Sequence, residues 1–280
     1  MKIIECPRDA MQGILKFIPT DLKIKYLNQL LKVGFDTIDF GSFVSPKVIP
    51  QLKDTASVLN GLDLTRSSSK LLAIIANLRG ADDACAFQQI HYLGFPLSVS
   101  EEFQERNTNK SVIQALNNVE EIQNLSKRHN KELVVYLSMA FGNPYGELYH
   151  TDIVSELVGK LHSMEISTIA LSDTIGTSNR QNITSVFNAV THDYPEIEFG
   201  VHFHTTSNAW KEKIDAAYQN GCRRFDSALK GYGGCPMADN KLVGNMPTEN
   251  LVHYFRNSLS LDKLELDKAL ALTESIFASK

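Results

Sequence analysis

Two histidines separated by one residue, His202 and His204, have the clearest chemical potential in this sequence. They lie in the segment Val201-His202-Phe203-His204, which predicts a strand. Residues two apart on a strand point to the same face, so both imidazoles can converge on one divalent metal ion. The spacing leaves one alternative open, a pair of hydrogen-bonded structural histidines.

Two oxygen donors elsewhere in the chain are candidates to complete such a site. Asp9 directly follows the first predicted strand, and Asn245 lies beyond the eighth. A set of two imidazoles, a carboxylate and an amide oxygen suits Mg²⁺ or Mn²⁺ better than zinc. Arg8, beside Asp9, could hold a substrate carboxylate or stabilise an enolate oxygen. The alternatives are a surface ion pair for Arg8 and Asp9 and a turn residue for Asn245.

Two further residues follow predicted strands and could transfer protons. Cys235 lies in Gly231-Tyr232-Gly233-Gly234-Cys235-Pro236, where the glycines give the loop the freedom that a mobile acid or nucleophile needs. Asp173 ends the sixth predicted strand and could orient a histidine or act as a base. The alternatives are an incidental thiol in a turn for Cys235 and a helix N-cap for Asp173.

Other polar residues at or near the ends of predicted strands are candidates for substrate contact. They are Gln12, Asp39, Ser42, Asn77 and Tyr136. The chain contains no P-loop, so four basic side chains are the candidates for binding phosphate groups of a ligand, namely Lys47, Arg79, Arg106 and Lys110.

These residues require a scaffold that brings strand ends together. Short apolar runs alternate with amphipathic segments along the whole chain, which predicts a single-domain (β/α)8 barrel of α/β class. An open, doubly wound sheet is the competing fold, and the lack of a GxGxxG motif after the first strand counts against it. The eight expected strands are Lys2–Cys6, Thr37–Phe40, Lys70–Ala76, Gln89–Leu97, Leu133–Met139, Thr168–Ser172, Glu198–His204 and Arg224–Ala228.

Helical patterns fill the intervals. The helix after the first strand begins at Thr20, a candidate N-cap, and ends before Gly34. Similar patterns cover residues 119–126, 153–161, 208–220 and 251–258. We expect the barrel to occupy about residues 1–258 and a helical extension about residues 259–280 of one domain, 1–280.

The composition suits one globular domain and excludes several classes of protein. Of the 280 residues, 43% are hydrophobic and 21% are charged, and the formal net charge is −4. We therefore expect neither nucleic-acid binding nor membrane association. Four cysteines without CxxC spacing and a first strand that starts at Lys2 favour a cytoplasmic protein. An organellar protein whose presequence has been removed is the alternative.

Together, these motifs resemble hydroxymethylglutaryl-CoA lyase from about Ile3 to Leu251. The motifs are Pro7-Arg8-Asp9, Ser42-Phe43-Val44-Ser45-Pro46-Lys47, Asp173-Thr174-Ile175-Gly176, His202-Phe203-His204, Gly233-Gly234-Cys235-Pro236 and Gly244-Asn245. The cysteine loop separates these lyases from isopropylmalate and homocitrate synthases. The resemblance implies a TIM barrel that splits an acyl-CoA, 3-hydroxy-3-methylglutaryl-CoA, into acetyl-CoA and acetoacetate, as in leucine degradation and ketone-body formation.

The resemblance also implies a role for each matching residue. Asp9, His202, His204 and Asn245 match the ligands of a divalent cation. Arg8 matches the arginine that stabilises the enolate, Cys235 the catalytic cysteine, and Asp173 a catalytic acid or base. In the expected mechanism, His202 or Asp173 takes the proton of the substrate's tertiary hydroxyl, and Cys235 helps to protonate the enolate.

The sequence departs from the family at several positions, which leaves the substrate open. Asp39 stands where a glutamate is usual, Ser172 where a glycine is usual, and Thr205 where an aspartate is usual. The segment after Asp9 also differs, although Gln12 is retained. The alternatives are an aldol-type lyase or Claisen condensing enzyme acting on another acyl-CoA or 2-oxo acid, and a ligand-binding barrel without catalysis. For the assembly, we keep a homodimer open.

Overall fold

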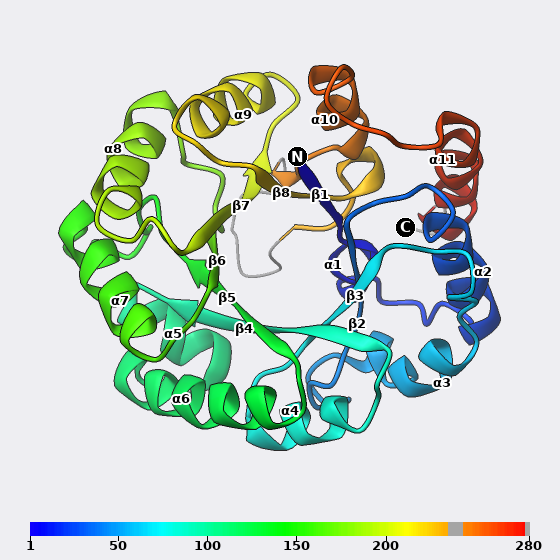
Figure 1. Cartoon of the computed structure of the whole chain (residues 1–280), viewed down its shortest axis with the longest axis horizontal. Coiled ribbons are helices and arrows are strands. Elements are labelled where there is room, and N and C mark those ends of the chain that lie inside the picture. The colour runs from blue at the N-terminus through cyan, green and yellow to red at the C-terminus, as the bar shows by residue number, and fades with distance from the viewer. Residues whose placement is uncertain (235–242, 278–280) are drawn as a thin grey trace.

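The computed structural model describes residues 1–234 and 243–277 and has a closed barrel of eight parallel strands at its centre (Figure 1). Each strand pairs with the next one in the chain, and β8 pairs with β1 to close the barrel. The predicted (β/α)8 fold is thus confirmed. The strands are β1 (Lys2–Glu5), β2 (Thr37–Ser42), β3 (Lys70–Ile74), β4 (Ile90–Ser98), β5 (Glu132–Ser138), β6 (Thr168–Asp173), β7 (Glu198–Thr205) and β8 (Arg224–Ser227).

The strands are near-continuously apolar because both of their faces are buried, as expected for a parallel sheet. One apolar core fills the space between the barrel and its helices. A smaller cluster fills the barrel interior, where alternate residues of β3 to β6 point inward. Its members are Leu72, Ile74, Tyr92, Val134, Tyr136 and Ala170.

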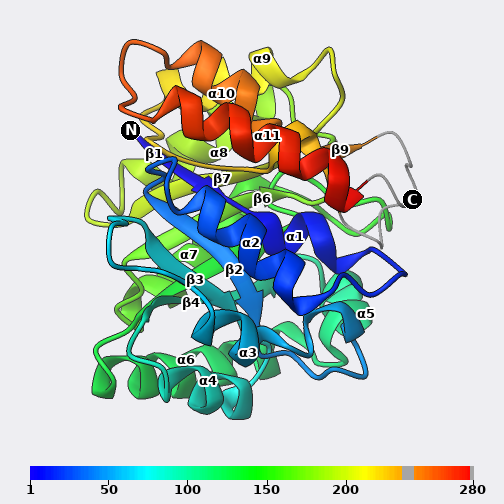
Figure 2. The same cartoon turned by 90° about the vertical axis from the view of Figure 1, so that its right-hand side faces the viewer.

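Helices surround the barrel as an outer ring, and α11 lies beside α2 (Figures 1 and 2). The α-helices are α1 (Pro7–Gln12), α2 (Thr20–Leu30), α3 (Thr55–Asn60), α4 (Leu78–Cys85), α5 (Glu101–Thr108), α6 (Val112–Arg128), α7 (Thr151–Ser163), α8 (Arg180–Thr191), α9 (Trp210–Gln219), α10 (Thr248–Tyr254) and α11 (Lys263–Phe277). Two 3₁₀ turns, η1 (Pro50–Leu52) and η2 (Leu229–Gly231), and a short strand, β9 (Gly244–Asn245), complete the described elements. In these described ranges, no helix is both long enough and apolar enough to cross a bilayer.

Two local predictions about the helices are wrong. Thr20 is the first residue of α2 and Pro19 is its N-cap; the Thr20 hydroxyl instead donates a hydrogen bond to Asp54 Oδ2 at 2.8 Å. The helix expected over residues 251–258 begins earlier, at Thr248, and ends at Tyr254. The apolar positions after Tyr254 therefore belong to the connection that leads to α11.

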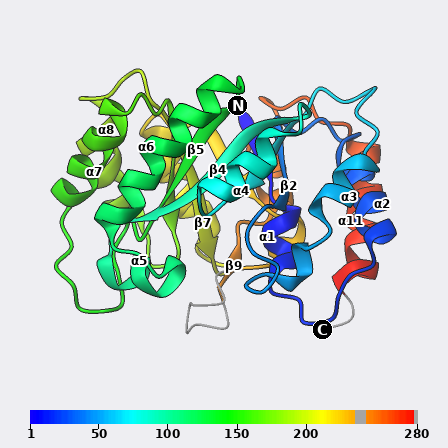
Figure 3. The ribbon, with the colours of Figure 1, turned by 90° about the horizontal axis from the view of Figure 1, so that it is seen from below.

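The strands end at one mouth of the barrel, and two elements outside the barrel line that mouth. Helix α1 begins immediately after β1, with Pro7 in its first turn, where a missing N–H costs nothing. Strand β9 pairs antiparallel with the end of β7, which aligns Asn245 with His204. Figure 3 shows α1 and β9 at the same end of the molecule.

Glu5, the last residue of β1, is a completely buried carboxyl group that joins this mouth to the chain segments after β8. The backbone N–H of Leu229 donates to Glu5 Oε1 at 2.9 Å, and the Thr248 hydroxyl donates to Oε2 at 2.5 Å. Burial raises the pKa of Glu5 from 4.5 to about 8, although both hydrogen bonds lower it. Glu5 is therefore neutral in the folded protein at pH 7.

We expect Glu5 to make stability decrease as the pH rises from about 4.5 to about 8. In that window the unfolded chain has lost the Glu5 proton and the folded protein has kept it, so rising pH favours unfolding. The Glu5→Gln variant should lack this contribution, whereas Glu156→Gln, on the exposed side of α7, should keep it. Urea denaturation across this pH range measures the difference, and parallel pH profiles for Glu5→Gln and the unaltered protein would contradict the assignment.

Candidate active site and metal centre

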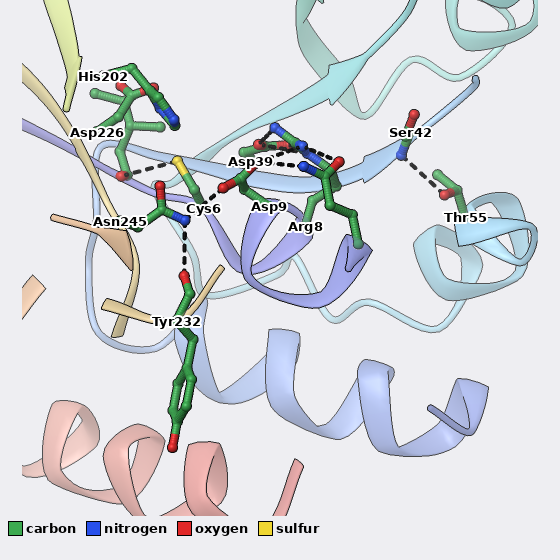
Figure 4. Close-up of polar contacts among 12 residues, drawn as sticks. Cys6, Arg8, Asp9, Asp39, Ser42, Thr55, His202, Asp226, Tyr232 and Asn245 are labelled. Carbon is green, nitrogen blue, oxygen red and sulfur yellow. Dashed lines mark hydrogen bonds and ion pairs between the residues drawn. The ribbon is translucent and has the colours of Figure 1, made fainter. Parts of the chain in front are cut away.

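The structure brings the four predicted ligands together at the barrel mouth. One ligand atom each from Asp9, His202 and His204 lies within 4.8 Å of the other two. The Asn245 side chain joins them, since its Nδ2 donates a hydrogen bond to Asp9 Oδ2 at 2.6 Å (Figure 4). Asp9 comes from the first turn of α1, the histidines from the inward face of β7, and Asn245 from β9. The convergence is observed, and the ligand role stays a prediction.

His204 has the hydrogen bonding of a metal ligand. Its Nδ1 lies 2.8 Å from the carbonyl oxygen of Thr174, to which it can only donate, so the lone pair is on Nε2. That Nε2 is buried and has no hydrogen-bond partner among the described residues. Burial, followed by the charge of His202, lowers the pKa of His204 to about 4, so the ring is neutral. A neutral imidazole with a buried free lone pair fits a divalent cation.

His202 is oriented by a carboxylate across the β7–β8 pair. Its Nδ1 lies 3.2 Å from Asp226 Oδ2, because the strand register places the two residues side by side. Burial alone would lower the pKa of His202, but the hydrogen bond and the charges of Asp226 and Asp9 outweigh it and raise the pKa. A carboxylate that binds one ring nitrogen fixes the tautomer and directs the other nitrogen toward an ion. Tyr136 lies edge-on to the His202 ring, with centroids 5.9 Å apart.

Arg8 and Asp9 are buried, so the alternative of a surface ion pair is wrong. The Arg8 guanidinium donates to Asp39 Oδ2 from Nε at 2.9 Å and from Nη2 at 2.6 Å. Its Nη1 donates to Asp9 Oδ1 at 3.0 Å and to Gln12 Oε1 at 2.8 Å. The predicted residues Gln12 and Asp39 therefore hold Arg8 beside the four ligands.

The same cluster sets the charge of its two carboxylates. Burial raises the pKa of Asp39 to about 6, and the Arg8 charge opposes that rise. Burial also raises the pKa of Asp9, but the charges of Arg8, His202 and His204 outweigh burial and lower that pKa below its usual value. Asp9 is therefore an anion at neutral pH, which is the state that a cation requires.

Asp173 lies at the buried end of β6 but makes its contacts away from the four ligands. Its Oδ2 accepts hydrogen bonds from Lys213 Nζ at 2.6 Å and from the Ser178 hydroxyl at 2.5 Å. The backbone N–H groups of Thr177 and Ser178 also donate to this carboxylate. The N-cap of α8 is Asn179, so the alternative role of Asp173 as that N-cap is wrong. Lys213 additionally donates to the carbonyl oxygen of His204 at 2.8 Å, which links Asp173 to β7.

The other predicted residues divide between local roles and the barrel interior. The Ser42 hydroxyl accepts a hydrogen bond from the Val44 N–H, and the Asn77 side chain caps α4 by accepting from the Gly80 N–H. Tyr136 points into the barrel, where its buried hydroxyl has no partner within the described part of the chain. Cys235 lies outside the described residues.

Sequence reasoning missed two polar side chains on β8 that lie beneath the site. Arg224 and Asp226 are two residues apart and both are buried, so they share the inward face of their strand. The Arg224 stem lies against Gly200 of β7, where a Cβ would come within 2.9 Å of Arg224 Cδ. The three guanidinium nitrogens and Asp226 Oδ1 have no hydrogen-bond partner in the described ranges. The sequence signal that could have identified them is the pair of charged residues, two apart, within an otherwise apolar strand.

Comparisons with known proteins agree with this geometry. A family model described as HMGL-like matches residues 2–276. The chain is 31% identical to the hydroxymethylglutaryl-CoA lyase YngG of Bacillus subtilis, over 96% of this chain and 89% of that one.

Solved structures of related enzymes have the same fold. An HMG-CoA lyase from Brucella melitensis matches with a TM-score of 0.92 at 26% identity, over 99% of both chains. An HMG-CoA lyase from Acinetobacter baumannii, solved with coenzyme A and 3-methylmalate, matches with a TM-score of 0.89 at 30% identity, over 99% of this chain and 91% of that one. The chain therefore belongs to the HMGL-like family of lyases.

Proposed function

We propose that this protein is a carbon–carbon lyase that uses a divalent cation to cleave 3-hydroxy-3-methylglutaryl-CoA into acetyl-CoA and acetoacetate. Membership of the HMGL-like family and the names of its relatives support this activity. The observation that carries the proposal is the convergence of Asp9, His202, His204 and Asn245 beside Arg8.

The proposed cation is Mg²⁺ or Mn²⁺, held by Asp9, His202, His204 and Asn245. Two hard oxygen donors and two imidazoles form a mixed set that suits these ions. When bound, such an ion makes a substrate hydroxyl more acidic and orients it. The cytoplasmic location and the homodimer expected from the sequence stay predictions.

Arg8 is the residue that we propose to stabilise the enolate formed when the carbon–carbon bond breaks. Its guanidinium is buried, charged and held in place by Asp39, Asp9 and Gln12. A donor that is fixed before the reaction starts stabilises developing negative charge without reorganising. Cys235 would then protonate the enolate carbon, as the family resemblance implies.

The base that takes the hydroxyl proton is either His202 or Asp173. A neutral imidazole has one lone pair, so His202 cannot bind the cation and accept a proton with the same nitrogen. The Asp173 carboxylate is already engaged, because Lys213 and Ser178 donate hydrogen bonds to it. If Asp173 is the base, it must first give up the hydrogen bond that it accepts from Ser178 and accept one from the substrate hydroxyl instead.

A second candidate is an aldol-type lyase or Claisen condensing enzyme that acts on another acyl-CoA or 2-oxo acid. It is favoured by Asp39, whose short side chain and double contact with Arg8 limit how far the guanidinium extends into the site. The Acinetobacter baumannii enzyme contains coenzyme A and 3-methylmalate, a hydroxy dicarboxylate, which supports binding of a CoA ester and a hydroxy acid in this fold.

Purified protein loaded with Mn²⁺ should release acetoacetate and acetyl-CoA from hydroxymethylglutaryl-CoA, as measured by mass spectrometry. Excess chelator should abolish release, and added Mn²⁺ should restore it. Arg8→Gln should lower kcat by about 10²–10³-fold, because it removes the charge that stabilises the enolate. Full turnover in chelator would refute the metal role, whereas activity confined to a different acyl-CoA or 2-oxo acid would replace the substrate.

Replacing Asp226 with Asn should weaken Mn²⁺ binding about 10–100-fold, because the carboxylate that orients His202 is lost. Isothermal titration calorimetry measures the affinity directly. Asp215→Asn, which removes a half-buried carboxylate paired with Arg180, is the matched control and should bind Mn²⁺ normally. Equal affinities for Asp226→Asn and the control would show that Asp226 does not position a ligand.

A further inference from the structure

A second group of possible metal ligands lies directly beside the first. One ligand atom each from Cys6, His202 and Asp226 falls within 4.8 Å of the other two. Cys6 follows the last residue of β1, and the other two side chains come from β7 and β8. Figure 4 shows Cys6, His202 and Asp226 next to Asp9 and Asn245. The two groups share one residue, His202.

The donor atoms of this second group suit a different class of ion. Thiolate and imidazole ligands favour Zn²⁺ and its heavier analogue Cd²⁺, whereas Mg²⁺ and Mn²⁺ prefer oxygen. Cys6 has only one weak contact to lose, from Sγ to the carbonyl oxygen of Ile4 at 3.6 Å. Asp226 is 3% exposed, and its Oδ1 has no hydrogen-bond partner among the described residues. A buried carboxylate oxygen without a partner is an available ligand.

His202 can serve only one of the two groups at a time. A neutral imidazole has a single lone pair in its plane, and its second nitrogen carries the proton. An ion held by Cys6 and Asp226 therefore uses the His202 lone pair. That lone pair is then not available to a catalytic cation held by Asp9 and His204. Occupation of one group excludes full occupation of the other.

We propose that Cys6, His202 and Asp226 form an inhibitory site for Zn²⁺ or another thiophilic divalent ion, which competes with the catalytic cation for His202. The inference rests on the proposed function, because inhibition requires that the first group be the catalytic one. Binding breaks the S–H bond of Cys6, forms a sulfur–zinc bond and releases one proton to solvent.

The surrounding charges favour this exchange of a proton for a dication. The carboxylates of Asp226, Asp39 and Asp9 act on Cys6 and create a negative potential there. The same negative potential attracts a cation of higher charge. The Arg8 charge opposes it, but a bound thiolate and the Asp226 carboxylate together balance the two charges of the ion.

The test uses Cd²⁺, because a cadmium–thiolate bond absorbs in the near ultraviolet and reports directly on sulfur coordination. Titration of the unaltered protein with Cd²⁺ should produce this band with a stoichiometry of about one. Cys6→Ser, which keeps the side-chain volume, and Cys6→Ala should both lose it. Cys85→Ala, which removes a thiol buried outside this cluster, is the control and should keep the band.

Three further variants separate the two groups of ligands. His204→Ala should lose Mn²⁺ binding and keep the cadmium band, whereas His202→Ala should lose both. Cys235→Ala should keep the band. A band that survives in Cys6→Ser, or that disappears in Cys235→Ala, would overturn the proposal by assigning the sulfur to another residue.

Enzymatic inhibition completes the test. Cys6→Ser should bind Mn²⁺ like the unaltered protein and should need at least about tenfold more Zn²⁺ for half-inhibition. Even the loss of a partner that only orients a ligand weakens metal binding about 10–100-fold. Unchanged inhibition by Zn²⁺ in Cys6→Ser contradicts the competition. If the unaltered protein forms the cadmium band but does not bind Mn²⁺, the proposed catalytic site fails while the thiolate site stands.

Discussion

The register of β7 with its two neighbours determines the geometry of the whole site. Pairing with β8 places His202 beside Asp226, and antiparallel pairing with β9 places His204 beside Asn245. Because side chains alternate along a strand, a shift of one residue would turn both imidazoles out of the barrel. Closure of the barrel prevents such a shift, since every strand is held on both sides. Asp9 can then reach the histidines from the helix that follows β1.

Around these four residues, buried charged side chains are arranged in ion pairs. Arg8 is held by Asp39 and Asp9, and Lys213 is held by Asp173. Removing one partner of a buried pair leaves an uncompensated charge, which costs about 3–5 kcal/mol. The same electrostatics separate the two histidines, since His202 has a carboxylate partner and a raised pKa, whereas His204 has a carbonyl partner and a lowered one. Mutations here will therefore alter both stability and function.

Sequence patterns were sufficient for the fold and for the convergence of the four ligands. Alternating apolar runs predicted the barrel, and a barrel brings strand ends together, so Asp9, His202 and His204 were expected at one mouth, with Asn245 as a candidate to join them. The partners of these residues could not be predicted, because they depend on strand register. Asp226 meets His202 across β7 and β8. For the same reason, the apolar sequence around Cys6 did not indicate that its thiol lies next to His202.

Local chemistry explains the remaining differences. Thr20 was expected to cap α2 but donates to Asp54 on another segment, whereas Asn77, a candidate for substrate contact, also caps α4. Lys213 of α9 is 2% exposed and joins Asp173 to the backbone of His204, a link that the sequence analysis did not anticipate. A lysine can extend its long stem to a buried carboxylate, and a single sequence does not identify that partner.

The central claim is that one divalent cation binds Asp9, His202, His204 and Asn245 together. A crystal structure of the protein with Mn²⁺, recorded at the manganese absorption edge, tests it most directly. The account predicts one strong anomalous peak within bonding distance of a carboxylate oxygen of Asp9, a nitrogen of each imidazole and the amide oxygen of Asn245. A peak bonded to neither histidine, or no peak at the barrel mouth in a Mn²⁺-saturated crystal, would contradict it.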